Sequence, residues 1–120
     1  AGIPLAVVTS SSDNKMQRLY DRLPHFADYF DAIITGADVT CSKPDPQGYM
    51  LAAERIGCNP ADCYVFEDSL SGIEAGIASG AVVIGLTTTL PADRLKGKAH
   101  RLIDGFAGFG IDDMLSVTRD

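Results

Sequence analysis

The chain has 120 residues, enough for one domain with a hydrophobic core of its own. Hydrophobic residues make up 46% of the sequence, which argues against a disordered chain. The formal net charge of −6 argues against a nucleic-acid partner, and no apolar run approaches the ~20 residues that a membrane span needs.

The cysteines and histidines show no pattern of a disulfide framework or a metal site. Cys41, Cys58 and Cys63 are odd in number and lack C-x-x-C spacing. His25 and His100 show no ligand spacing, so we expect no zinc site. The first four residues contain no basic segment of the kind that begins a signal peptide. These observations predict free thiols in a cytoplasmic protein.

Short apolar runs alternate along the chain with helical patterns. Strands are expected at residues 5–8, 31–34, 64–66, 82–84 and 102–103. Helices are expected from residue 13 or 14 to about 23, and at 46–56, 70–79, 91–95 and 111–117. This alternation predicts a doubly wound α/β fold with a mostly parallel, Rossmann-like sheet and right-handed crossovers.

Helix caps and inward faces follow from particular residue types. Asp13 or Asn14 is expected to cap the first helix, and Asp45 the second, with Pro46 in its first position. The side chains expected to face the core are Met16, Leu19, Tyr20 and Leu23 in the first helix, Tyr49, Met50, Ala53 and Ile56 in the second, and Leu70, Ile73 and Ile77 in the third.

The stretch from Tyr64 to Gly80 organises the chain. An apolar strand ends at two adjacent acids, Glu67 and Asp68, and Ser69 then caps a helix that stops at Gly80. Ligands of open α/β sheets bind beyond the carboxyl ends of the strands. Two carboxylates there repel each other unless a cation lies beside them, and oxygen ligands favour Mg²⁺. The alternative is an Asp that caps the helix beside a solvated Glu.

Two further polar points are expected at the same edge of the sheet. Thr9, Ser10 and Ser11 follow the first strand, and hydroxyls with nearby backbone N–H groups can bind phosphoryl oxygens. Lys43, in S-K-P-D-P, supplies a positive charge for the same oxygens. Taken singly, the hydroxyls are ordinary turn residues and the lysine is a solvated side chain. The joint order of the three features indicates phosphate chemistry.

That order resembles the haloacid dehalogenase-like (HAD) superfamily, in its sugar-phosphatase and β-phosphoglucomutase branch. Thr9, or Ser10 if the register shifts by one, stands at that family's second motif, and Lys43 stands at its third. Glu67 and Asp68, in E-D-S-x-x-G-I, stand at its fourth. The resemblance covers almost the whole chain, and it implies that Thr9 and Lys43 are catalytic.

The resemblance also implies a ligand set and a substrate class. The phosphoryl group would be held by residues of the second and third motifs: Thr9, Ser10, Ser11 and Lys43. Glu67 and Asp68 would hold Mg²⁺. The implied function is a Mg²⁺-dependent phosphatase that acts on a small phosphorylated metabolite, such as a sugar phosphate.

The family's first motif does not occur in the sequence. That motif is a D-x-D run at the end of a central strand, and its first Asp forms a phospho-aspartate intermediate; no D-x-D occurs in residues 1–120. The family's cap domain is also missing, so the chain resembles the C-terminal portion of one core domain. Without the first strand, a gap of two strand spacings, ~9.6 Å, is expected between the strands that end at Thr9 and Asp68. Such a gap exposes backbone edges, so we expect a missing N-terminal segment or another chain to complete the sheet. Without that strand, we do not expect residues 1–120 to form a stable monomer.

Two other classes of function compete with a phosphatase. A response-regulator receiver is also acidic and doubly wound, but its acidic pair comes first and its Lys-Pro last, whereas here Lys43 precedes Glu67. A non-catalytic interaction protein could keep the fold and lose the chemistry.

Overall fold

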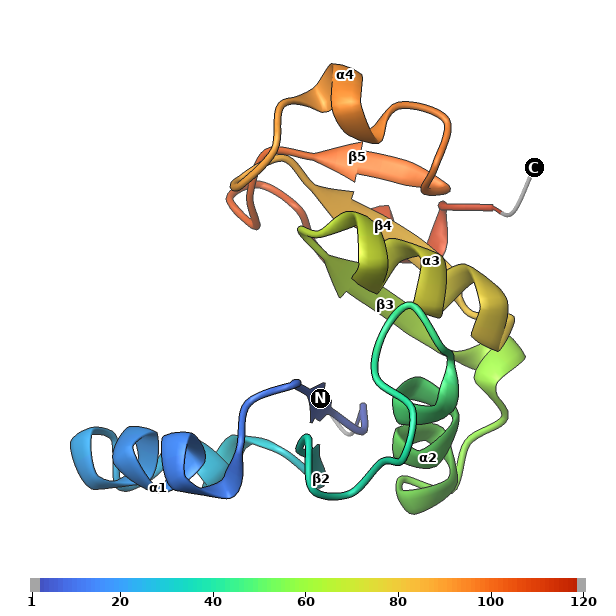
Figure 1. Ribbon diagram of the computed structural model, residues 1–120. Coiled ribbons are helices and arrows are strands. Elements are labelled where there is room, and N and C mark those ends of the chain that lie inside the picture. Colours follow the sequence, from blue (N-terminus) through green and yellow to red (C-terminus); the bar gives the residue numbers. More distant parts are fainter. Residues whose placement is uncertain (1–2, 119–120) are drawn as a thin grey trace.

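The computed structural model describes residues 3–118 (Figure 1). The strands are β1 (Ala6–Val8), β2 (Ala32–Ile34), β3 (Tyr64–Glu67), β4 (Val82–Leu86) and β5 (Arg101–Ile103). The α-helices are α1 (Asp13–Arg22), α2 (Gln47–Arg55), α3 (Leu70–Ser79), α4 (Ala92–Leu95) and α5 (Ile111–Leu115). Two 3₁₀ helices, Phe26–Tyr29 and Pro60–Asp62, precede β2 and β3.

All strand pairs are parallel, and they form two separate groups. β1 pairs with β2, and the other three strands lie in the order β3-β4-β5. Among the residues that the structure describes, β1 pairs only with β2 and β3 only with β4, so each keeps one unpaired edge. The predicted α/β fold is confirmed, and so is the predicted interruption of the sheet between β1 and β3 (Figure 1).

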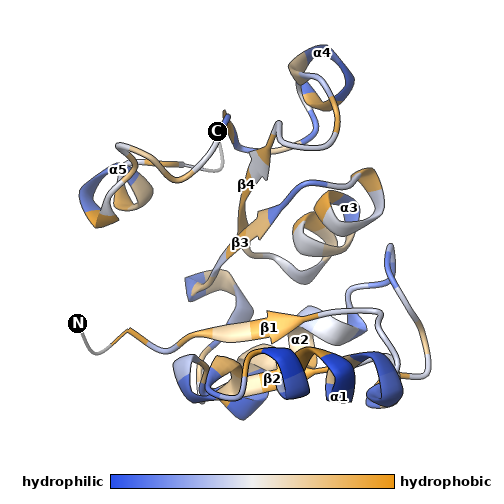
Figure 2. Ribbon diagram, turned by 90° about the vertical axis from the view of Figure 1, so that its left-hand side faces the viewer, coloured by the Kyte–Doolittle hydropathy of each residue, from blue (hydrophilic) through white to orange (hydrophobic). Residues whose placement is uncertain are grey.

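The core lies on both faces of β4, because successive residues of a strand point to opposite faces. Val83 packs with Ile73 of α3 on one face. Val82 and Ile84 pack on the other face, where Met114 of α5 covers them in part. On the smaller sheet, β1 and β2 are apolar along their length, whereas α1 is largely hydrophilic (Figure 2). α2 contacts both β1 and β2 and also α3, so it connects the two groups of strands.

The helix termini differ in detail from the sequence prediction. Ser12 caps α1 in place of Asp13 or Asn14, because its hydroxyl oxygen accepts a first-turn backbone N–H at 3.3 Å. α2 begins one residue later than predicted, although the Asp45 carboxylate still accepts the Gln47 N–H at 2.9 Å. The caps of α3 are confirmed.

Three side chains expected in the core are largely exposed, so their predictions are wrong. Leu23 is 53% exposed because it is the C-cap residue, where the backbone has already left the helix. Met50 of α2 and Ile77 of α3 are 50% and 41% exposed. The buried residues of these helices are mostly small instead: Gly48, Ala52 and Ala53 in α2, and Gly72, Ala75 and Gly76 beside Ile73 in α3. Within residues 3–118, no helix is both long and apolar enough to cross a membrane.

Candidate active site

The polar points predicted from the sequence lie around one cleft. The cleft has a volume of about 780 Å³ and lies between the unpaired edges of β1 and β3. Its walls include residues from both strands and from the turns that follow them. The predicted site residues among them are Thr9, Ser10, Lys43, Glu67 and Asp68. Ser11, the other predicted site residue, follows Ser10 in the turn after β1 but does not line the cleft.

The turn after β1 is shaped by its own hydroxyl. The Ser11 backbone N–H donates to the Thr9 hydroxyl oxygen at 3.1 Å, and the Thr9 N–H donates to the Ile34 carbonyl at 2.9 Å. Because this hydroxyl oxygen is used as an acceptor, its own hydrogen is free to point to an anion in the cleft. Gly36 lies so close to this turn that a Cβ there would be 2.8 Å from the Ser10 carbonyl oxygen, so the close approach requires glycine.

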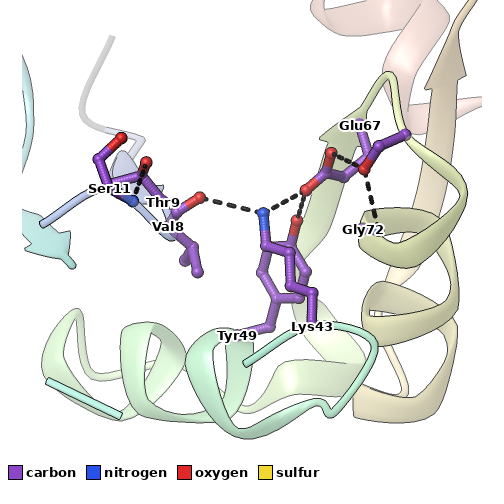
Figure 3. A network of polar contacts seen from close by, with 8 residues as sticks. Val8, Thr9, Ser11, Lys43, Tyr49, Glu67 and Gly72 are labelled. Atoms are coloured by element: carbon purple, nitrogen blue, oxygen red, sulfur yellow. Dashed lines mark hydrogen bonds and ion pairs between the residues drawn. The ribbon is translucent and has the colours of Figure 1, made fainter. Parts of the chain in front are cut away.

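Lys43 extends from its loop into the cleft and contacts both walls (Figure 3). Its Nζ lies 2.5 Å from a carboxylate oxygen of Glu67, at the end of β3. It also donates to the Val8 carbonyl oxygen, at the end of β1, at 3.2 Å. The ammonium group therefore lies beside the Thr9 turn, as the phosphate site predicted from the sequence requires.

Tyr49 holds both members of this ion pair. Its hydroxyl donates to the same Glu67 oxygen that Lys43 contacts, and the Lys43 Nζ lies 5.1 Å from the centre of its ring. Burial, and then the hydrogen bond to Glu67, raises the pKa of Tyr49 well above its usual value, so the hydroxyl keeps its proton. From its position in the sequence, Tyr49 was expected only to face the core.

Glu67 is buried, with 7% of its surface exposed, and it lies over the first turn of α3. A Cβ on Gly72 would lie far closer than 3.0 Å to the Glu67 carboxylate, so any larger residue here requires that carboxylate to move. Ser69 caps α3 through the Gly72 N–H at 3.0 Å, and its hydroxyl lies 3.4 Å from the second Glu67 oxygen. The positive end of the helix dipole adds to the stabilisation of this carboxylate.

Asp68 has a separate environment although it is next to Glu67 in sequence. It is half-buried, and one carboxylate oxygen accepts the Thr89 hydroxyl at 2.6 Å. The cation beside Glu67 is therefore Lys43, and Asp68 is the more accessible carboxylate at this edge. In the part of the chain that the structure describes, no three His, Cys, Asp or Glu residues are grouped closely enough to hold a metal ion. The pair thus offers at most part of a coordination shell.

The fold and the site together define a doubly wound α/β domain with hydroxyl, lysine and carboxylate groups at one sheet edge. The chain belongs to the haloacid dehalogenase-like hydrolase family, whose sequence profile matches residues 1–80.

Several of the relatives that it matches are named as phosphatases. It is 38% identical over 93 residues to validoxylamine A 7'-phosphate phosphatase of Streptomyces hygroscopicus subsp. limoneus. The aligned residues make up 78% of this chain and 43% of that protein. It is 36% identical over 105 residues to the phosphorylated carbohydrates phosphatase of Thermotoga maritima, with 88% and 43% covered. The structure of CbbY from Rhodobacter sphaeroides in complex with phosphate is 33% identical, with a TM-score of 0.79 and with 91% of this chain and 49% of that chain covered. The chain thus spans less than half the length of these relatives.

Proposed function

We propose that this chain forms the larger part of the catalytic domain of a phosphatase that hydrolyses a small phosphorylated metabolite. The observation that carries the proposal is the position of Lys43, whose ammonium group lies in the cleft between the ends of β1 and β3 and beside the Thr9 turn. The names of the two phosphatase relatives support a sugar phosphate as the substrate class.

The residues of the cleft divide the work of binding a phosphoryl group. Lys43 would neutralise one of its oxygens, and the Thr9 hydroxyl would donate to another. Ser10 is exposed beside Thr9 and would add its backbone and hydroxyl groups, whereas the Ser11 N–H supports Thr9. Glu67 and Tyr49 would keep the lysine in place while the substrate binds and leaves. Such positioning and charge stabilisation are the main contributions of a protein to phosphoryl transfer.

The carboxylates at this edge fit Mg²⁺ as part of its shell. Asp68 is the better direct ligand, because one oxygen of Glu67 is already shared by Lys43 and Tyr49. When bound, the ion would neutralise charge on the phosphoryl oxygens. Mg²⁺ keeps several waters when few protein ligands are present, so we expect weak binding to this chain alone.

The nucleophile would come from a strand inserted between β1 and β3. The arrows of β1 and β3 point to the same side in Figure 2, and both strands present unpaired edges to one cleft. A third parallel strand would pair with both edges and remove the cost of leaving them unpaired. The carboxyl end of such a strand would lie beside Lys43, where an acidic residue is favoured by charge. We propose that a D-x-D motif from a preceding segment or another chain occupies this position.

Complementation by a peptide tests the proposed function. An apolar peptide that ends in D-x-D is added to residues 1–120 with Mg²⁺, and hydrolysis of p-nitrophenyl phosphate is followed. We expect turnover with this peptide and none with a matched N-x-D peptide, because only the first can form a phospho-aspartate. If the D-x-D peptide binds at residues 5–8 and 64–66 without turnover, the chain is a non-catalytic interaction protein.

A further inference from the structure

Two of the three cysteines share the end of the cleft that lies farthest from Lys43. Cys58 follows α2, Cys63 directly precedes β3, and both thiols are half-buried and line the cleft. Glu67 stands at the opposite end of β3, about 13 Å from Cys63 at the usual rise of a strand. Cys41 lies elsewhere, on the exposed loop that Gln47 holds by accepting its backbone N–H at 2.7 Å.

A tight turn joins the two cysteines, and both line the same cleft. The Cys58 N–H donates to the Ala53 carbonyl at 2.9 Å, which fixes the start of the turn against α2. The Cys63 N–H donates to the Pro60 carbonyl at 3.0 Å, and this closes the 3₁₀ helix between them. The Cys63 sulfur reaches back to the carbonyl oxygen of Asn59, the residue after Cys58, at 3.4 Å.

The environment of Cys63 agrees with a neighbouring thiol. Burial raises the pKa of Cys63, and the Cys58 thiol raises it further by charge and by a hydrogen bond. The Cys63 thiol therefore keeps its proton more readily than a free cysteine does and is a weaker nucleophile. It reacts only when an oxidant supplies a disulfide for exchange.

We propose that Cys58 and Cys63 form a dithiol that a small-molecule disulfide oxidises to an intramolecular disulfide bond. In the first step, one thiol loses its proton and attacks a sulfur of oxidised glutathione, which forms a mixed disulfide and releases one reduced glutathione. In the second step, the other cysteine attacks the protein sulfur of that mixed disulfide and releases a second reduced glutathione. Two protein thiols are oxidised, and one glutathione disulfide is reduced. The inference rests on the turn and the cleft, and it does not depend on the proposed phosphatase activity.

The experiment compares the products of oxidation by intact mass and by peptide mapping. The Cys41→Ser variant is incubated with oxidised glutathione and then treated with iodoacetamide. We expect its mass to fall by two hydrogen atoms, both alkylatable thiols to be lost, and dithiothreitol to restore them. In the wild-type chain, we expect a Cys58–Cys63 linkage and a glutathione adduct on Cys41.

Matched variants and alternative products decide the proposal. Cys58→Ser and Cys63→Ser should each take up a glutathione that they cannot expel, because the second thiol is missing. Separate adducts on both cysteines of Cys41→Ser, a disulfide-linked dimer or a linkage to Cys41 in the wild-type chain would overturn the proposal. So would two alkylatable thiols that survive conditions in which Cys41 is modified. Phosphate binding in the oxidised chain is expected to be unchanged, because the dithiol lies at the far end of β3.

Discussion

Replacing Gly72 with alanine is expected to displace Glu67 and to disrupt the site from within. The added Cβ would lie far inside 3.0 Å of the Glu67 carboxylate carbon and both of its oxygens. The helix backbone cannot move without losing its cap at Ser69, so the carboxylate must swing away. It would then leave Lys43 and Tyr49, which both contact one of its oxygens.

The expected loss of stability follows from these two contacts. Each hydrogen bond to a charged group contributes about 1.5–3 kcal/mol, so the two together contribute about 3–6 kcal/mol. Alanine stabilises a helix by up to about 1 kcal/mol relative to glycine, which offsets part of the loss. We therefore expect Gly72→Ala to lower the free energy of unfolding by about 2–5 kcal/mol, in line with the cost of breaking a buried ion pair.

A double-mutant cycle with urea unfolding measures the effect. In a Glu67→Ala background the steric conflict is gone, so Gly72→Ala should be neutral or slightly stabilising there. Gly76→Ala, in the same helix, serves as a comparison for a steric conflict that does not involve Glu67. Its Cβ would lie 2.8 Å from Val83 Cγ2 and 3.2 Å from Val65 Cγ1, so it should lower stability by the same amount in both backgrounds. If Gly72→Ala lowers stability equally in both backgrounds, Glu67 does not explain the requirement for glycine.

Three further predictions concern proton binding, activity and metal binding. The folded chain raises the pKa of Tyr49 above the unfolded value of 10.0, so its contribution to stability is full below that pH and is lost as pH rises above it. Wild type should therefore lose stability relative to Tyr49→Phe between about pH 9 and about pH 11 in urea unfolding, and a constant difference would count against the raised pKa. Residues 1–120 alone should not hydrolyse p-nitrophenyl phosphate with Mg²⁺ present, and turnover that Asp68→Asn abolishes would contradict this. Mg²⁺ should shift the backbone amide NMR signals of residues 67–69 at low affinity, and shifts confined to other residues would refute the site.

The sequence predicted the order of the elements and the edge at which the site lies. Parallel strands that are buried on both faces are continuous apolar runs, so β1, β3 and β4 can be recognised without tertiary information. Polar residues that follow such runs must lie at the carboxyl edge, which is how Thr9 and Glu67 were placed. Lys43 was also expected at this edge, but its catalytic role rested on the resemblance to a family, because nothing local fixes how a loop lysine reaches the end of a strand.

The contacts that support the site could not be read from the sequence. The hydroxyl of Tyr49 and the space at Gly72 depend on how closely α2 and α3 approach the end of β3, which periodicity does not determine. Gly72 did carry a signal. A glycine lowers helix stability relative to alanine, so its presence in a helix suggests that another group lies where a side chain would be. The separation of Glu67 from Asp68 likewise depends on Lys43 and Thr89, which are distant in sequence.

The position of bound phosphate tests the central claim most directly. Inorganic phosphate is titrated into the wild-type chain and into Lys43→Ala, and backbone amide NMR signals are followed in both. We predict that phosphate shifts the signals of residues 9–11 and 43, and that Lys43→Ala weakens binding by about 1.5–3 kcal/mol, or roughly 10-fold to 150-fold. Equal affinity in the two proteins, or shifts that avoid the turn after β1, would contradict a phosphate site in this cleft.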